Sequence, residues 1–314
     1  MDRFQRFQTL MLREWLQHRT GWLVLACGPS LLMALLSLFD GRGIDVRLDD
    51  NDQLGQLSRL PLSQLPLTLQ ILGWTVATTG LAMLLVTLTV LFQLPGLARR
   101  DQQDRSIEFW RSLPVGHGEA VAATLLMHLL LLPALVLTAA LLGAQLVAML
   151  AIVLHHGPLP WLQQPWLPLL ASLLVAAARV WLGLLMAVLW LSPLLLLTMA
   201  ASAWLKRWAM PVLAALSLLG VYWLDARLTQ PVVGPAFQRL GTEALYALLA
   251  PDLFDGPRRL GQGSLDATLA GLPIALLQDG LRVLDSAASP AFLLALLGGA
   301  LGFALLVLRR QRAD

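Results

Sequence analysis

The stretch from Leu169 to Leu205, LLASLLVAAARVWLGLLMAVLWLSPLLLLTMAASAWL, decides the fold of this chain, and Arg179 is its only charged residue. A run of about 18 or more such residues is long enough to cross a bilayer as a helix. Cutting the run into two short spans would carry Lys206 and Arg207 to the other side of the membrane. We therefore expect one long helix here, in a helical membrane protein.

Composition supports this class of protein. Of the 314 residues, 57% are hydrophobic and 13% are charged, whereas soluble chains carry roughly a quarter of charged residues to cover their surface. The single cysteine, Cys27, excludes an intrachain disulfide. Charges are scattered through the first twenty residues, so we do not expect a signal peptide there.

Similar apolar runs recur along the chain and predict one transmembrane domain over residues 1–314, all-α, with six spans. The predicted spans lie at about residues 21–39, 69–94, 120–154, 169–205, 208–224 and 290–308. The third and fourth runs exceed the bilayer thickness and are expected to project beyond it. On this placement Arg179 lies near the outer interface, where its side chain can snorkel to water.

Two segments are expected to be helical without crossing. In residues 1–20, Phe4, Phe7, Met11 and Trp15 recur at helical spacing between basic residues, which predicts an amphipathic helix on the membrane surface. The extracytoplasmic region 225–289 contains an uncharged stretch too short to span. Residues 267–284 are therefore predicted to form a helix that lies in the interface or dips into it.

The distribution of basic residues predicts the orientation. With six spans both termini share a side, and 13 of the 22 basic residues fall on that side. Arg309 and Arg310, and likewise Lys206 and Arg207, lie directly at span ends. The positive-inside rule then places both termini in the cytoplasm, in the cytoplasmic (inner) membrane of a bacterium.

The loop at 99–119, LARRDQQDRSIEFWRSLPVGHGEA with its flanks, is the most informative segment. Ile107, Trp110 and Leu113 form an apolar stripe that Phe109 widens, and Pro114 ends the helix. A short helix that exposes two aromatic side chains to the cytoplasm must dock on headgroups, on the protein's own spans or on a partner protein. These three alternatives stay open from the residues alone.

This loop resembles that of the permease subunit of type-2 ATP-binding-cassette (ABC) exporters. In that family an Arg/Glu-rich stretch precedes Leu-Pro-Val and a Glu that opens the third span. The residues that match here are Arg105, Glu108, Arg111, Leu113, Pro114, Val115 and Glu119. The stretch VLWLSPLLLLTMAASAWLKR, residues 188–207, is similar to the family's fourth helix.

The resemblance implies a coupling helix seated in an ATPase subunit. Its coupling residues would be Arg105, Ile107, Glu108, Phe109, Trp110, Arg111, Leu113 and Pro114. No phosphate-binding loop surrounds Lys206, so ATP and Mg²⁺ would be bound by a separate ABC-type ATPase, and this chain is not expected to be an enzyme. A homodimer of the chain with two ATPases follows, embedded in lipid, with no cofactor, metal or nucleic acid bound by the chain itself.

Several other residues were weighed as candidate sites. Arg179 is a charged residue within an apolar run, and such residues are often functional. His128 is expected to be a hydrogen-bonded packing residue. His155 and His156 have no further ligand nearby in sequence, which makes a metal site there improbable. Small residues in the last span allow close helix approach, either in a dimer contact or in packing within the chain: Gly298, Gly299, Ala300 and Gly302.

The sequence bears on three function classes other than an exporter. A secondary transporter would normally show carboxylates near the midplane, and every Asp and Glu falls in a predicted loop or end. A hydrolase would need a nucleophile and base or metal ligands, and no predicted span offers a His with an acid one turn away. A non-transporting membrane scaffold stays open as an alternative.

Overall fold

The structure is a computed structural model that describes residues 3–39, 66–103, 116–250 and 265–312. Every regular element in these ranges is helical, and no strand occurs in them. Five of the described helical stretches are long and apolar enough to cross a membrane: Phe4–Ser37, Leu67–Ala98, His117–His156, Trp166–Leu224 and Pro290–Arg312. The described residues therefore confirm an all-helical protein with long apolar helices, which is consistent with a helical membrane protein.

The N-terminal half of the chain forms three long helices. Helix α1 spans Arg3–Ser37 and α3 spans Leu67–Gln103. The third is built from α5 (His117–Leu125), the π-helix η3 (Leu126–Leu131) and α6 (Leu132–His156), which follow one another without a break. After a short helix, α7 (Pro158–Leu162), the chain turns into α8.

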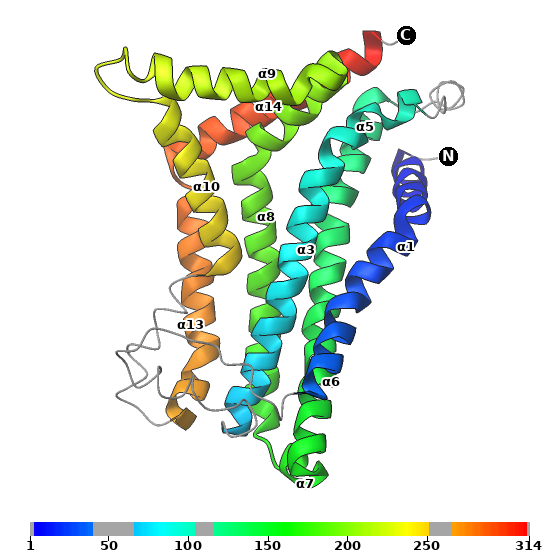
Figure 1. Ribbon diagram of the computed structural model, residues 1–314, viewed down its shortest axis with the longest axis vertical. Coiled ribbons are helices and arrows are strands. Elements are labelled where there is room, and N and C mark those ends of the chain that lie inside the picture. The colour runs from blue at the N-terminus through cyan, green and yellow to red at the C-terminus, as the bar shows by residue number, and fades with distance from the viewer. Residues whose placement is uncertain (1–2, 40–65, 104–115, 251–264, 313–314) are drawn as a thin grey trace.

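Helix α8 spans Trp166–Leu205 as one continuous helix, which confirms the prediction for the stretch 169–205. It is the central element of the C-terminal half. Helices α10 (Val233–Leu249) and α13 (Leu265–Ser286) pack along its first half, and α14 (Pro290–Arg312) packs along its second half. Figure 1 shows α8 bending towards the upper right in its last part, where α14 follows it.

The predicted interfacial helix 1–20 and the first span 21–39 turn out to be one helix, α1, which bends in Figure 1 but has no break. Similarly, α3 includes residues 99–103 and α5 includes 117–119, which the sequence had assigned to the cytoplasmic loop. Apolar length predicts where a helix can cross a membrane, but it does not show how far the helix continues into polar sequence.

The predicted fifth span also differs from expectation. After α8 the chain reverses through η4 (Lys206–Trp208) into α9 (Ala209–Leu218) and the π-helix η5 (Leu219–Leu224). In Figure 1, α9 runs across the top of the molecule at a steep angle to α3 and α6. Ala209 is its only buried residue, and most of its other residues are exposed.

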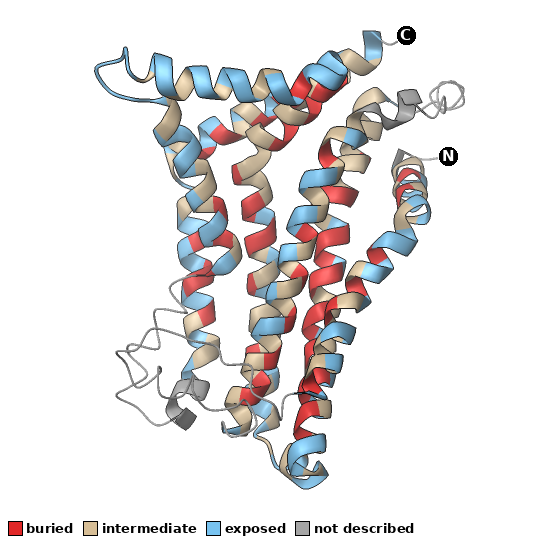
Figure 2. Ribbon diagram, viewed as in Figure 1, coloured by how far each residue is buried: buried red, intermediate tan, exposed pale blue. Residues whose placement is uncertain are grey.

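The core lies between the helices, and their outer faces are apolar as well. Figure 2 shows buried residues concentrated on the sides of α6 and α8 that face their neighbours. Exposed leucines such as Leu142 and Leu174 are 60% and 71% accessible. A protein in water would cover such side chains, so this surface is suited to contact with lipid tails.

Close helix contacts tie α14 to α8. Gly298, Gly299 and Gly302 of α14 face Pro193, Ser192 and Leu196 of α8 so closely that a methyl group at any of them would collide with the opposite helix. The prediction that small residues in the last span allow close approach is confirmed, and the contact they serve lies within the chain.

Candidate functional site

The sequence-predicted coupling residues cannot be placed. Arg105, Ile107, Glu108, Phe109, Trp110, Arg111, Leu113 and Pro114 all lie within residues 104–115, outside the described part of the chain. Their flanks can be placed. The end of α3 and the start of α5 lie at the same end of the molecule as both termini of the chain and the end of α8 (Figure 1).

At that shared end, basic side chains make cation–π contacts with an aromatic ring and a hydrogen bond with a carbonyl group. Arg309 and Arg312 of α14 lie over the ring of Trp204 on α8, at 5.7 and 5.4 Å from its centroid. The Nε of Arg309 also donates a hydrogen bond to the carbonyl oxygen of Ala203. Basic side chains at the C-terminal ends of both helices complement their dipoles and join α8 to α14 at this end.

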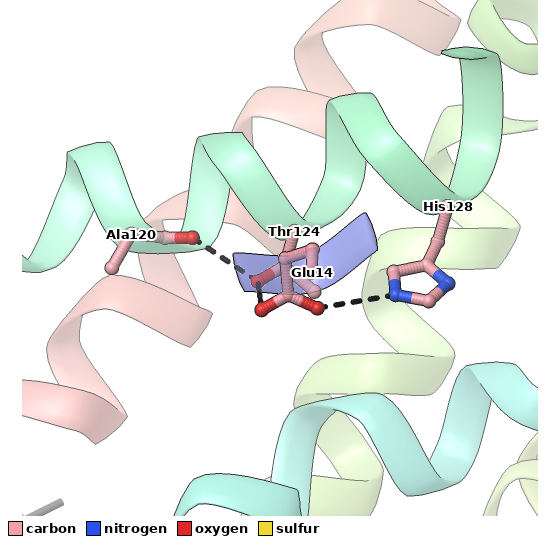
Figure 3. A network of polar contacts seen from close by, with 4 residues as sticks. All are labelled: Glu14, Ala120, Thr124 and His128. Atoms are coloured by element: carbon pink, nitrogen blue, oxygen red, sulfur yellow. Dashed lines mark hydrogen bonds and ion pairs between the residues drawn. The ribbon is translucent and has the colours of Figure 1, made fainter. Parts of the chain in front are cut away.

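A buried polar cluster lies between α1 and the third long helix. The carboxylate of Glu14 on α1 accepts a hydrogen bond from the Thr124 hydroxyl at 3.3 Å and lies 3.2 Å from Nε2 of His128. Figure 3 shows Glu14 between these two side chains, which project from α5 and η3. Glu14 is 7% and His128 1% exposed, so both groups are removed from solvent.

Two further rings complete this cluster. The ring of His18, one helical turn after Glu14, meets that of His128 edge to face at a centroid distance of 4.7 Å. The ring of Trp22 lies 6.3 Å from the ring of His128, centroid to centroid. One ligand atom each from Glu14, His18 and His128 fall within 4.8 Å of one another. We refer to Glu14, His18 and His128 as the α1–η3 cluster.

The π-helix positions His128 in this cluster. In η3 the N–H of Leu132 bonds to the carbonyl of Met127, five residues earlier. Pro133 follows directly and has no N–H to donate, and its ring would collide with the carbonyl four residues before it. The helix widens here because of this proline, and such π-turns are frequent at functional sites.

A second buried ion pair lies at the far side of α8. The guanidinium of Arg179 pairs with the carboxylate of Asp279 on α13 and donates hydrogen bonds to the carbonyls of Ala247 and Tyr246 on α10, the first at 2.7 Å. Arg179 is 5% exposed. The prediction that it snorkels to the interface is wrong, because α10 and α13 cover it and supply its partners.

These two clusters also correct the argument that every carboxylate lies in a loop or at an end. Glu14 and Asp279 are both buried within helices, at 7% and 6% exposure. Their partners lie 114 and 100 positions away along the chain, so spacing within one span could not reveal them. The one local signal was the four-residue spacing of Glu14 and His18, which places both on one face of a helix.

His155 and His156 belong to different contacts. His156 Nε2 lies 3.2 Å from the side-chain nitrogen of Gln70 on α3, and His155 Nδ1 lies 2.8 Å from the carbonyl of Ala151. Within the described residues they belong to no group of three potential metal ligands.

An apolar groove opens between α3, α6 and α8. Its cavity volume is about 70 Å³, and Thr87 is the only polar residue among those that line it. Met83, Leu129, Pro133, Leu184 and Leu191 contribute to its walls. The lining of this groove is that of a site for an apolar ligand.

Comparison with known protein families, curated proteins and solved structures found no match for this chain.

Proposed function

We propose that this chain is the membrane-spanning permease subunit of an ABC exporter, which moves a hydrophobic or amphipathic substrate outward with ATP hydrolysed by a separate subunit. It would reside in a bacterial inner membrane with both termini in the cytoplasm. Two copies of the chain would assemble with two ABC-type ATPases that bind ATP and Mg²⁺.

The observation that carries this proposal is the meeting of basic segments at one end of the molecule. The flanks of the loop that holds Phe109 and Trp110 lie at the same end as both termini and the end of α8. Lys206, Arg207, Arg309, Arg310 and Arg312 lie in the elements that meet there. The positive-inside rule makes such an end cytoplasmic, which is where an ATPase could engage the loop.

The groove supports the class of substrate. Its nearly uniform apolar lining offers few polar partners, so a sugar or an ion would lose its hydration there without compensation. A lipid, a hydrophobic peptide or an amphipathic drug fits this lining.

The test is co-purification of an ABC-type ATPase with the full chain, followed by ATP turnover of the two purified subunits in proteoliposomes. Turnover should rise when they are combined. A Phe109→Ala/Trp110→Ala variant should lose both association and stimulation. Trp161→Ala/Trp166→Ala is the matched control. Trp161 lies in α7 and Trp166 begins α8, their ring centroids are 4.6 Å apart, and α7 lies at the opposite end of the molecule. Unchanged association in the first variant would refute the proposal.

A secondary transporter is the second candidate, because the α1–η3 cluster contains a buried carboxylate and histidine of the kind used in proton relays. A secondary transporter must move its substrate without an ATPase. In proteoliposomes that contain this chain alone, a pH gradient should then drive uptake of an amphipathic dye, and Glu14→Gln should abolish it. Dye movement that depends on the ATPase and ATP favours the exporter.

A further inference from the structure

We propose that the α1–η3 cluster is a binding site for one divalent transition-metal ion of the Zn²⁺ class, held by Glu14, His18 and His128. This inference is independent of the proposed function, because it concerns ligand chemistry within the chain.

The donor set is the first argument. Two imidazoles and one carboxylate are a combination that binds Zn²⁺ with three protein ligands and leaves a fourth position for water. Softer or harder ions fit less well, since Cu⁺ favours thiolates and Ca²⁺ favours six or more oxygens. Within the described residues this is the only group of three or more such side chains close enough to share an ion.

Geometry is the second argument. Bonds of about 2.0–2.2 Å in a tetrahedral site place ligand atoms roughly 3.3–3.5 Å apart. The distance from Glu14 Oε2 to His128 Nε2 is 3.2 Å, close to that value, and all three ligand atoms fall within 4.8 Å. The third ligand comes from His18, which is half-buried.

The surroundings are the third argument. Among the described residues, Nδ1 of His128 is buried and has no hydrogen-bond partner, so Nε2 is the nitrogen of this ring that engages the cluster. Figure 3 shows this nitrogen turned away from Glu14 while Nε2 faces it. The Thr124 hydroxyl holds the other carboxylate oxygen at 3.3 Å. A hydrogen bond of this kind orients a carboxylate ligand and tunes its affinity.

A bound ion would join α1 to the π-turn of the third helix. Glu14 and His18 share one face of α1, and His128 is presented by η3, so the ion would bridge two helices that also meet through a hydrogen bond, ring contacts and apolar packing. The site therefore fixes the N-terminal part of α1 against the third helix when metal is present.

The experiment uses the full chain in nanodiscs, stripped with a chelator and titrated with Co²⁺ as a spectroscopic probe, then with Zn²⁺ as competitor. We expect one Co²⁺ per chain, d–d absorption of a four-coordinate ion, and displacement by Zn²⁺. His18→Gln should weaken Co²⁺ binding at least about tenfold, and Glu14→Gln and His128→Gln should do the same. His155→Gln and His156→Gln are the matched controls and should leave the titration unchanged.

His18 is half-buried, so His18→Gln keeps the test decisive if the two buried variants fail to fold. Absence of stoichiometric Co²⁺ uptake by the unmodified chain would overturn the site. Uptake that persists in His18→Gln, or that is lost in His155→Gln, would overturn it as well.

Discussion

The guanidinium of Arg179 on α8 is paired with the carboxylate of Asp279 on α13, and both side chains are more than nine-tenths buried. The pair joins α13 to α8. Because the same guanidinium bonds two carbonyls at the end of α10, a single side chain connects three helices.

Removing one member of this pair should destabilise the chain strongly. Asp279→Asn leaves a buried guanidinium without its counter-charge, which typically costs about 3–5 kcal/mol. We expect a lower midpoint of thermal unfolding in detergent and faster proteolysis of residues 225–289. Arg179→Met/Asp279→Leu should recover part of the loss but not all of it, because the carbonyls of Tyr246 and Ala247 then lack their donor. A loss below 1 kcal/mol in Asp279→Asn would contradict the pairing.

The contact between α14 and α8 should tolerate no added methyl group. At Gly302 a Cβ would lie 2.7 Å from Cβ of Leu196 and 3.0 Å from the backbone nitrogen of Leu197. Since backbone must move, Gly302→Ala should destabilise by about 1–3 kcal/mol. Gly80→Ala in α3 is the matched control, with nothing within 4 Å of the added methyl. It should be neutral or stabilise by up to about 1 kcal/mol through helix propensity. Equal unfolding midpoints for the two variants would count against this packing.

The π-turn should depend on Pro133. In Pro133→Ala the helix can return to regular α-helical bonding, which would rotate His128 by about 100°, the turn of one residue, away from Glu14. We expect the coupling free energy between Glu14→Gln and His128→Gln, measured by a double-mutant cycle on unfolding midpoints in detergent, to be larger with Pro133 present than in Pro133→Ala. Equal coupling free energies in the two backgrounds would show that the proline does not set the position of His128.

The start of α10 should depend on pH through Asp225. Its carboxylate accepts hydrogen bonds from the backbone N–H groups of Gly234, Val233 and Val232 at 2.6–2.8 Å. These hydrogen bonds lower the pKa of Asp225 below its ordinary value of 3.8, and the bond from Gly234 has the largest effect. Because the folded pKa is lowered, the stabilisation is fully present above pH 3.8 and is lost as the pH falls through the folded pKa.

Amide exchange at residues 232–234, corrected for the intrinsic rate at each pH, measures this effect. Protection should hold from neutral pH to about pH 4 and fall only below it. Asp225→Asn should reduce protection at neutral pH and remove the pH dependence. Protection that changes between pH 7 and pH 5 would point to a different titrating group.

Much of the fold could be predicted because membrane helices are encoded locally. The apolar run from Leu169 to Leu205 predicts α8 almost to the residue, and the proline at 290 coincides with the start of α14. The direction of α9 could not be predicted, since apolar length gives a helix but does not give its angle to its neighbours.

The buried polar groups were missed for a related reason. Arg179 could be recognised as unusual, but its partner lies on a different helix that sequence alone does not bring near. Glu14 was assigned to the membrane surface because residues 1–20 carry many charges, and its burial arises only when α1 packs on His128 and Thr124. Local periodicity specifies faces of helices, whereas the pairing of those faces is decided by tertiary packing.

The reversal between α8 and α9 takes place at Lys206, whose φ is positive at 51° with ψ of −119°. A positive φ is disfavoured for a residue that carries a Cβ, and glycine would avoid this cost. The chain keeps an ammonium group at this corner in spite of that cost. One residue therefore sets both the direction of α9 and the positive charge at the bend. Glycine at this position would make the backbone between α8 and α9 more flexible and would remove the charge.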